Sequence, residues 1–490
     1  MLGLTNPIQF RPICIGMYVN YPGSGQDEDC LFANVFAPAN ATAESKLPVW
    51  VFIQGGGYTS NANANWNGAG VVRRSGHNLV FVNFNYRVGL YGFLASERVR
   101  ADGALNAGLL DQRFLLRWVQ RHIAAFGGDP ARVVVHGASA GAGSVALHLV
   151  AHGGRDDGLF VGAAAESVFL PAAQQVAALE WQFDLVSAAV GCAHHADELA
   201  CLRARPTAAL QATNVGAPFP GAAAPPAFYW TPCVDGDLLP DRPYRLFAAG
   251  RVVARAATLF GTDTDEGSVF APDAPDRAAL AGFFRNNFPR LSPAGADALV
   301  ARYPRLPPLP RHARWFPSAS RAYGEAVFTC PAVNMLTALA RHAHANTSTT
   351  DATTSTAAAA VVPAGRHWGY RYDVYDAESE AAGMGVVHLF EAAAIFGPEN
   401  IGWAPPSYWT YNAPIVPLVM DYWISFVRAL DPNVYRNPAA PEWLEWDAAG
   451  AGAGGRRLLF RTGNLTVEET PRDQVERCDF WLAMGDEMEQ

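Results

Sequence analysis

Short apolar runs alternate along the chain with segments in which apolar residues recur at helical spacing. The runs predicted to be strands cover residues 47–53, 79–84, 132–136, 256–260 and 368–374. Residues 109–125 have the periodicity of a helix and end at a Phe-Gly-Gly-Asp-Pro segment, which is typical of a helix stop before a new strand. Strands that alternate with helices predict a large, mostly parallel sheet flanked by helices, the α/β class.

The composition is that of a globular protein and argues against nucleic-acid binding and against a transmembrane segment. The chain has 490 residues, half of them hydrophobic and 17% charged, which is typical of a globular protein. Its 36 basic and 45 acidic residues give a net charge of −9, and no cluster of Lys or Arg could follow a phosphate backbone, so nucleic acid is not expected as a partner. The apolar runs are far shorter than the ~18 residues that cross a bilayer, so no transmembrane segment is expected.

The chain shows no repeat and no domain linker, so residues 1–490 are predicted to form a single domain. The Thr, Ser and Ala-rich segment 344–365 is expected to be a low-complexity surface insertion. The oligomeric state cannot be predicted from the sequence.

The cysteines point to an oxidising compartment. Six of the seven are spaced as three disulfides, with Cys233 left over, and the alternative is a reduced enzyme with seven buried thiols. Metal-type C-x-x-C spacing is absent, and no metal or organic cofactor is expected. The expected pairs are Cys14 with Cys30, Cys192 with Cys201, and Cys330 with Cys478.

Three N-glycosylation sequons, at Asn40, Asn346 and Asn464, agree with secretion. The first 16 residues lack the basic and apolar regions of a signal peptide, so we expect either a start further upstream or unusual export.

A nucleophile elbow is predicted at Ser139. The apolar run 132–136 leads directly into Gly137-Ala138-Ser139-Ala140-Gly141 and then into a helix-compatible stretch. Strand, tight turn of small residues and helix together are the context in which a G-x-S-x-G serine is exposed at the edge of a sheet. The alternative is a Gly/Ala-rich turn with no chemical role.

A serine nucleophile needs a base and an acid that orients it. The strand 256–260 leads into a loop with three carboxylates, Asp263, Asp265 and Glu266, and Asp263 and Asp265 are expected to cap the next helix instead. In the chain order Ser, acid, His, the base must lie further on. His388 follows the strand 368–374 at the correct end, whereas the other downstream histidines do not: His312, His342, His344 and His367.

A third segment could supply oxyanion donors. The segment Gln54-Gly55-Gly56-Gly57 directly follows the strand 47–53, and its glycines leave the backbone free to turn N–H groups towards a substrate oxygen. A phosphate-binding loop is the alternative, but the Lys of a Walker sequence is missing.

Together these segments resemble the type-B carboxylesterase and lipase family, which includes cholinesterases and secreted fungal esterases, and the 51–57 segment is similar to its fungal branch. The resemblance implies an α/β-hydrolase fold and a serine esterase that forms an acyl-enzyme. It implies Ser139 as nucleophile, Glu266 as acid, His388 as base, and Gly56, Gly57 and the Ala140 N–H as oxyanion hole, with the three disulfides. The matching segments are 28–31, 34–35, 55–57, 106–112, 126–130, 137–141, 265–267, 388 with 391, 422–423 and 431–433.

Some positions depart from the family pattern. Ala138 stands where many members have Glu before the nucleophile, and Gln54 where they have His before the glycines. Glu166-Ser167-Val168 replaces a usual Gln-Ser-Gly segment, and the family's N-terminal hairpin is expected to be missing from this chain.

Three other functions compete with a soluble esterase. The first is a triacylglycerol lipase of the same family, although the 15 residues between Cys14 and Cys30 are few for a lid. The second is an inactive binding or adhesion relative, which would lack the nucleophile. The third is cholinesterase-like selectivity, with Tyr58 and Trp66 lining a pocket.

Overall fold

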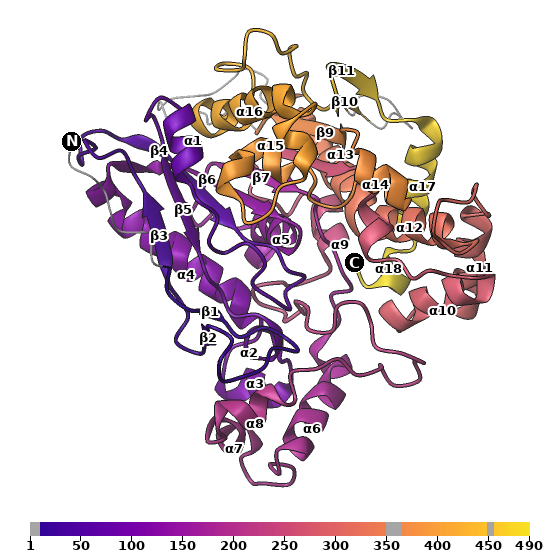
Figure 1. Cartoon of the computed structure of the whole chain (residues 1–490). Helices are drawn as coiled ribbons and strands as arrows, with labels where there is room; N and C mark the ends of the chain where they lie inside the picture. The colour runs from indigo at the N-terminus through magenta and orange to yellow at the C-terminus, as the bar shows by residue number, and fades with distance from the viewer. Residues whose placement is uncertain (1–9, 349–364, 448–454) are drawn as a thin grey trace.

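The computed structural model describes residues 10–348, 365–447 and 455–490. In these residues the main sheet has nine strands in the order β11-β10-β9-β8-β7-β6-β4-β5-β3 (Figure 1). The strands from β5 to β10 in this order pair in parallel, and β3 and β11 are antiparallel at the two edges. The strands are β3 (Ala33–Phe36), β4 (Leu47–Ile53), β5 (Val80–Phe84), β6 (Gly128–Ala138), β7 (Gly162–Glu166), β8 (Ala257–Asp263), β9 (His367–Asp373), β10 (Arg456–Arg461) and β11 (Asn464–Glu469).

Side chains alternate along the central strands, so each strand contributes to a core on both faces of the sheet. In β4, Val49, Val51 and Ile53 pack in one core, and Trp50 and Phe52 pack in the other. Both sets are fully buried. This two-sided burial explains why the predicted strands are nearly continuous apolar runs.

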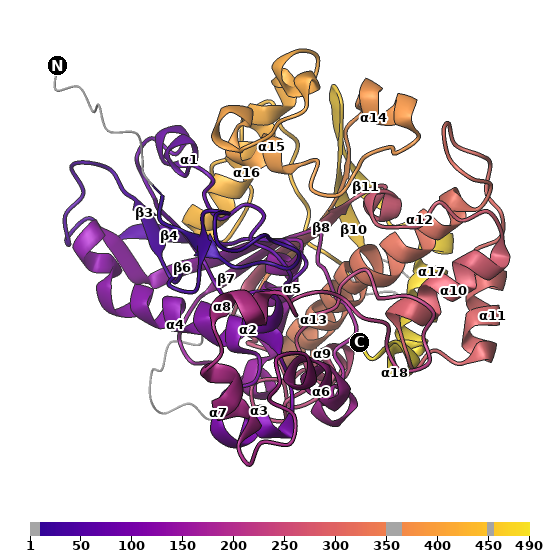
Figure 2. The same ribbon diagram turned by 60° about the horizontal axis from the view of Figure 1, so that its bottom comes forward.

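Helices cover both faces of the sheet. On one face lie α4 (Ala107–His122), α5 (Ala140–Gly154) and α13 (Cys330–Ser348), and on the other α1 (Ala69–Arg74), α15 (Ala392–Phe396) and α16 (Val416–Ala429) (Figure 2). The remaining β-strands and α-helices of the described residues are β1 (Ile13–Cys14), β2 (Gln26–Asp27), α2 (Gly89–Phe93), α3 (Glu97–Asp102), α6 (Glu180–Ala189), α7 (Glu198–Arg203), α8 (Thr207–Gln211), α9 (Pro243–Ala248), α10 (Arg277–Asn287), α11 (Pro293–Arg302), α12 (Phe316–Gly324), α14 (Ala377–Ala382), α17 (Arg472–Ala483) and α18 (Gly485–Met488).

The five predicted strands are present as β4, β5, β6, β8 and β9, with small shifts of their ends. The sequence did not predict β7, because its residues Gly-Ala-Ala-Ala-Glu have low strand propensity. The first residues of the predicted insertion 344–365 belong to α13, which continues to Ser348, and the insertion itself stays a prediction. The rest of that segment, 349–364, lies outside the described residues.

The structure contains three disulfides, which excludes the alternative of seven thiols. Their Cα atoms are 4.9 Å apart in Cys14–Cys30, 5.7 Å apart in Cys192–Cys201 and 4.8 Å apart in Cys330–Cys478. Cys233 is a buried free thiol. Of the three sequon asparagines, Asn40 and Asn464 are exposed, and nothing is described for the side chain of Asn346.

Candidate active site

Ser139 occupies a strained turn between β6 and α5. Its φ of 56° lies in the left-handed region, which a non-glycine residue enters at a cost of about 1–3 kcal/mol. The two glycines of the motif are needed for close packing: a Cβ on Gly137 would lie 2.1 Å from the Gly141 carbonyl oxygen, and one on Gly141 would lie 2.0 Å from that of Ile53. This geometry is that of the predicted nucleophile elbow.

His388 and Glu266 form a direct hydrogen bond. Glu266 begins a 3-10 turn (Glu266–Val269) just after β8, and its Oε2 lies 2.5 Å from Nδ1 of His388. Its other oxygen accepts the Asp263 N–H at 2.9 Å, so both carboxylate oxygens are held in place. Among the described residues, Nε2 of His388 is buried and has no hydrogen-bond partner. The imidazole is therefore oriented by its Nδ1 side, and Nε2 is the atom that can take up a proton.

The parallel sheet brings these segments together, although they are far apart in sequence. Ala138 at the end of β6 is paired with Glu166 at the end of β7, and Glu166 with Gly261 on β8. The Ser139 N–H continues this pattern by donating to the Glu166 carbonyl at 2.9 Å. Because reactive groups in open α/β sheets lie beyond the carboxyl ends of strands, the elbow and the acid loop lie at the same edge.

The expectation that Asp263 and Asp265 cap the next helix is wrong. Neither side chain caps the 3-10 turn. Oδ2 of Asp263 accepts the Phe390 N–H at 3.2 Å, and Oδ2 of Asp265 accepts the Val386 N–H at 2.9 Å. Both carboxyls thus tie the acid loop to the loop that carries His388, a connection that only the tertiary fold creates.

A group of buried carboxyls lies behind the Glu266–His388 pair. Asp263, Glu166 and Glu391 are at most 1% exposed, and Glu391 accepts the Tyr370 hydroxyl at 2.8 Å. Burial, followed by repulsion from neighbouring carboxylates, raises the pKa of Asp263 and of Glu166 well above the ordinary range. Burial also raises the pKa of Glu391. The raised pKa values favour the protonated forms of these three carboxyls, so the negative charge close to the Glu266–His388 pair is reduced.

We predict that Asp265→Asn stabilises the protein at neutral pH. Burial raises the pKa of Asp265 from 3.8 to about 6, so between these values the folded state binds more protons than the unfolded state. Stability therefore falls as pH rises through this window, by about 1–3 kcal/mol for this partly exposed group. Urea unfolding should show the variant more stable than wild type at pH 7.5, with the gain disappearing near pH 4. An equal difference at both pH values would contradict this account.

The three-glycine loop lies directly against the elbow. A Cβ on Gly55 would lie 2.9 Å from the Cβ of Ser139, and Gly56 and Gly57 have φ values of 114° and 63°. These conformations are open to glycine and strained for other residues. The N-terminus of α5, which begins at Ala140, adjoins the same turn. The glycine loop and the start of α5 thus both adjoin Ser139, which is the place where an oxyanion hole would need backbone N–H donors.

Four phenylalanines line the space around the site, and the sequence did not single them out. Phe328 and Phe270 contact the His388 ring at centroid distances of 4.6 and 5.0 Å. Phe169 donates its N–H to the Ser139 carbonyl at 3.3 Å and packs on Phe228, whose ring blocks a Cβ at Gly57. The four lie far apart in sequence, three in connecting segments and Phe328 in the helical turn Glu325–Thr329, so no local motif could have identified them.

Tyr58 and Trp66 do not line a pocket beside the site, so the expectation behind the cholinesterase-like alternative is wrong. Tyr58 is completely buried and packs on Phe93, and Trp66 stacks on Phe52 in the core on the other face of the sheet. Ordinary core packing explains both aromatic residues.

The other downstream histidines have structural partners. His367 bonds Thr258 at 2.8 Å, His312 stacks on Phe316, and His342 contacts the Ala248 carbonyl. The side chain of His344 is not described. In the parts of the chain that are described, no group of three His, Cys, Asp or Glu side chains could hold a metal ion, and no helix is long and apolar enough to span a membrane.

A doubly covered sheet with a serine elbow, a downstream acid and a histidine at one edge defines the α/β-hydrolase class. The chain belongs to the carboxylesterase family, whose pattern matches residues 5–481. It is a hydrolase of carboxylic esters, as expected from the resemblance.

Three similar proteins are fungal. The chain is 31% identical over 458 residues to Secreted lipase 1 of Botryotinia fuckeliana, covering 88% of this chain and 74% of the relative. It is 36% identical over 300 residues to Lipase 1 of Geotrichum candidum, covering 57% of this chain and 52% of that protein. The crystal structure of Aspergillus niger EstA superposes with a TM-score of 0.91 at 45% identity, covering 98% of this chain and 89% of EstA.

Proposed function

We propose that Ser139, His388 and Glu266 are the catalytic triad of this esterase. The observation that carries the proposal is the hydrogen bond between Glu266 and Nδ1 of His388, at the sheet edge that also bears the strained Ser139. Nε2 of His388 takes the proton from the Ser139 hydroxyl as Oγ attacks the acyl carbon, and returns it to the leaving alcohol. Water then releases the acid from the acyl-enzyme by the same proton route.

The oxyanion of each tetrahedral intermediate would be stabilised by the N–H groups of Gly56, Gly57 and Ala140. Donors fixed before the reaction are worth more than flexible ones, because no reorganisation occurs as charge develops. A p-nitrophenyl ester tests this scheme by pre-steady-state kinetics. When deacylation is the slower step, a burst of nitrophenol equal to the enzyme concentration is expected. Hydrolysis that needs an added metal would contradict the scheme.

Short-chain, soluble esters are the proposed substrates, and lipase activity is the second candidate because several relatives are named lipases. The segment between Cys14 and Cys30 is held in place rather than free: Nε2 of Gln211 donates to the carbonyls of Gly16 and Val19 at 2.9 and 3.0 Å.

We therefore predict no interfacial activation. The rate on a short-chain ester such as tributyrin should rise smoothly as the substrate concentration passes its solubility limit, because no lid has to open at an oil surface. A lipase from the same family, assayed in parallel, serves as the control. A sharp increase of rate at the solubility limit would favour the lipase function.

Secretion is the proposed location. Disulfides persist in oxidising compartments, and two similar fungal proteins are named secreted lipases. The exposed Asn40 and Asn464 would then be available for glycosylation.

A further inference from the structure

The carbonyl of Gly56 is fixed by the turn that follows it. The N–H groups of Thr59 and Ser60 both donate to this oxygen at 3.0 Å, and their hydroxyls contact it at 3.0 and 3.3 Å. The Gly56–Gly57 peptide is trans, because the described residues contain a cis bond only at Tyr21–Pro22. In a trans peptide the carbonyl and the next N–H point in opposite directions. The Gly57 N–H is therefore held facing away from the turn.

The start of the glycine loop is fixed by side-chain amides. The Gly55 N–H donates to Oδ1 of Asn63 at 2.9 Å, and Asn63 is 5% exposed. The preceding residue, Gln54, donates from Nε2 to Oδ1 of Asn61 at 2.7 Å, and its carbonyl accepts the Tyr86 hydroxyl at 2.9 Å. Both the backbone and the side chain of the residue before the glycines are thus anchored.

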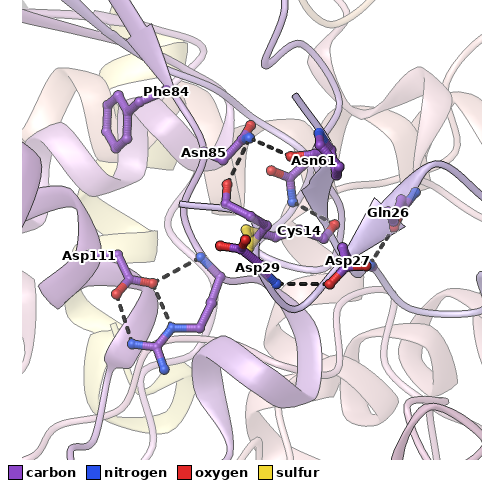
Figure 3. The surroundings of a disulfide bond; sticks show 12 residues. Cys14, Gln26, Asp27, Asp29, Asn61, Phe84, Asn85 and Asp111 are labelled. Atoms are coloured by element: carbon purple, nitrogen blue, oxygen red, sulfur yellow. Dashed lines mark hydrogen bonds and ion pairs between the residues drawn. A yellow bond between two sulfur atoms is a disulfide. The ribbon is translucent and has the colours of Figure 1, made fainter. Parts of the chain in front are cut away.

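These amides connect the glycine loop to the first disulfide. Nδ2 of Asn61 donates to the Cys14 carbonyl at 3.3 Å, and the Met17 N–H donates to the Thr59 carbonyl at 2.9 Å. Nδ2 of Asn85 holds the other half-cystine by donating to the Cys30 carbonyl at 2.9 Å. Figure 3 shows Asn61 and Asn85 beside the Cys14–Cys30 bond.

We propose that Gln54, Asn61 and Asn63, together with the disulfide-closed segment 14–30, are positioning elements that set the direction of the oxyanion-hole N–H groups. Segment 14–30 is then a support for the glycine loop and not a lid. The proposal rests on the proposed function of Gly56 and Gly57. The proposal also assigns a role to Gln54. Its side-chain amide donates to Asn61, and this amide does not change its charge with pH.

The predicted consequence is a loss of transition-state stabilisation without loss of substrate binding. Removing one oxyanion donor costs about 10²–10³ in kcat, so misdirecting donors should cost about 10–100-fold. Asn63→Ala and Gln54→Ala are expected to lower kcat by this factor and to change KM by less than about threefold. Asn63→Asp keeps an acceptor for the Gly55 N–H and should retain most of the activity.

The test combines these variants with Gln120→Ala as a matched control, since Nε2 of Gln120 also donates to two carbonyls, those of Pro130 and Leu159. Besides kcat and KM, affinity is measured for a trifluoromethyl ketone, whose adduct with the serine places a negative oxygen in the hole. This affinity should fall with kcat in Gln54→Ala and Asn63→Ala and stay unchanged in Gln120→Ala.

Folded Gln54→Ala and Asn63→Ala proteins with wild-type kcat and ketone affinity would overturn the proposal, as would equal losses in Gln120→Ala. If Asn63→Ala does not fold, Asn61→Asp is used in its place, because this change keeps the acceptor for Gln54 and removes the donor to the Cys14 carbonyl. A decrease of kcat at constant KM in Asn61→Asp would support the proposal, and an unchanged kcat would contradict it. A wild-type protein that hydrolyses no ester would instead contradict the proposed function.

Discussion

Replacing Ser139 with alanine is expected to lower kcat for ester hydrolysis by about 10⁴-fold or more. Alanine removes the only atom that can form the acyl-enzyme in the proposed scheme and leaves the strained turn and the packing of Gly137 and Gly141 intact. The residual rate would come from the oxyanion hole and from substrate binding alone. The comparison is the steady-state rate of purified variant and wild type on the same short-chain ester.

Ser187→Ala is a suitable control for this variant. Ser187 is a fully buried serine on α6 whose hydroxyl donates to Glu198 at 2.9 Å, so its loss affects packing and hydrogen bonding but not the site. Its activity should equal that of wild type. A Ser139→Ala protein that retains ester hydrolysis would contradict the assignment of the nucleophile.

The second large effect is expected for Glu266→Gln, with a decrease of kcat by about 10³–10⁴-fold. The carboxylate accepts from Nδ1 of His388 at 2.5 Å, and in the proposed scheme it would stabilise the imidazolium that forms during the reaction. A glutamine amide carries no charge and can turn its NH₂ group towards Nδ1, which favours the wrong tautomer. Nε2 would then carry a proton and could not act as the base.

Rates measured for Glu266→Gln over a range of pH test this explanation, with Glu180→Gln as control. Glu180 lies on α6 and accepts the Ser96 hydroxyl at 2.7 Å, so this change also removes a bonded carboxylate. Only the change at Glu266 should affect kcat. A wild-type kcat in Glu266→Gln at neutral pH would show that another group orients His388.

The sequence predicts the framework of the fold because its central strands consist of β-branched and aromatic residues buried on both faces. The segments 47–53 and 79–84 have this character, whereas β7 is composed mainly of alanine and carries no such signal. Its place in the sheet is decided by pairing with β6 and β8. Tertiary pairing therefore overrides local propensity at this strand.

The candidate triad could be predicted because each residue follows a strand end and the chain order restricts the base. The contacts that orient these residues could not be predicted, since they join loops far apart in sequence. Asp263 is an example: its position in the sequence favours a helix cap, but its carboxyl accepts the N–H of Phe390, which lies 127 residues later in the chain. The roles of Asn61 and Asn63 likewise depend on how segment 14–30 packs against the glycine loop.

The central claim is that Ser139 is an activated nucleophile, and labelling with a fluorophosphonate tests it most directly. The purified protein would be treated with the reagent and digested, and mass spectrometry would locate the adduct. We predict a single adduct on Ser139 and loss of esterase activity in proportion to labelling. An adduct on another serine such as Ser167, or no adduct on a folded protein that hydrolyses esters, would contradict it.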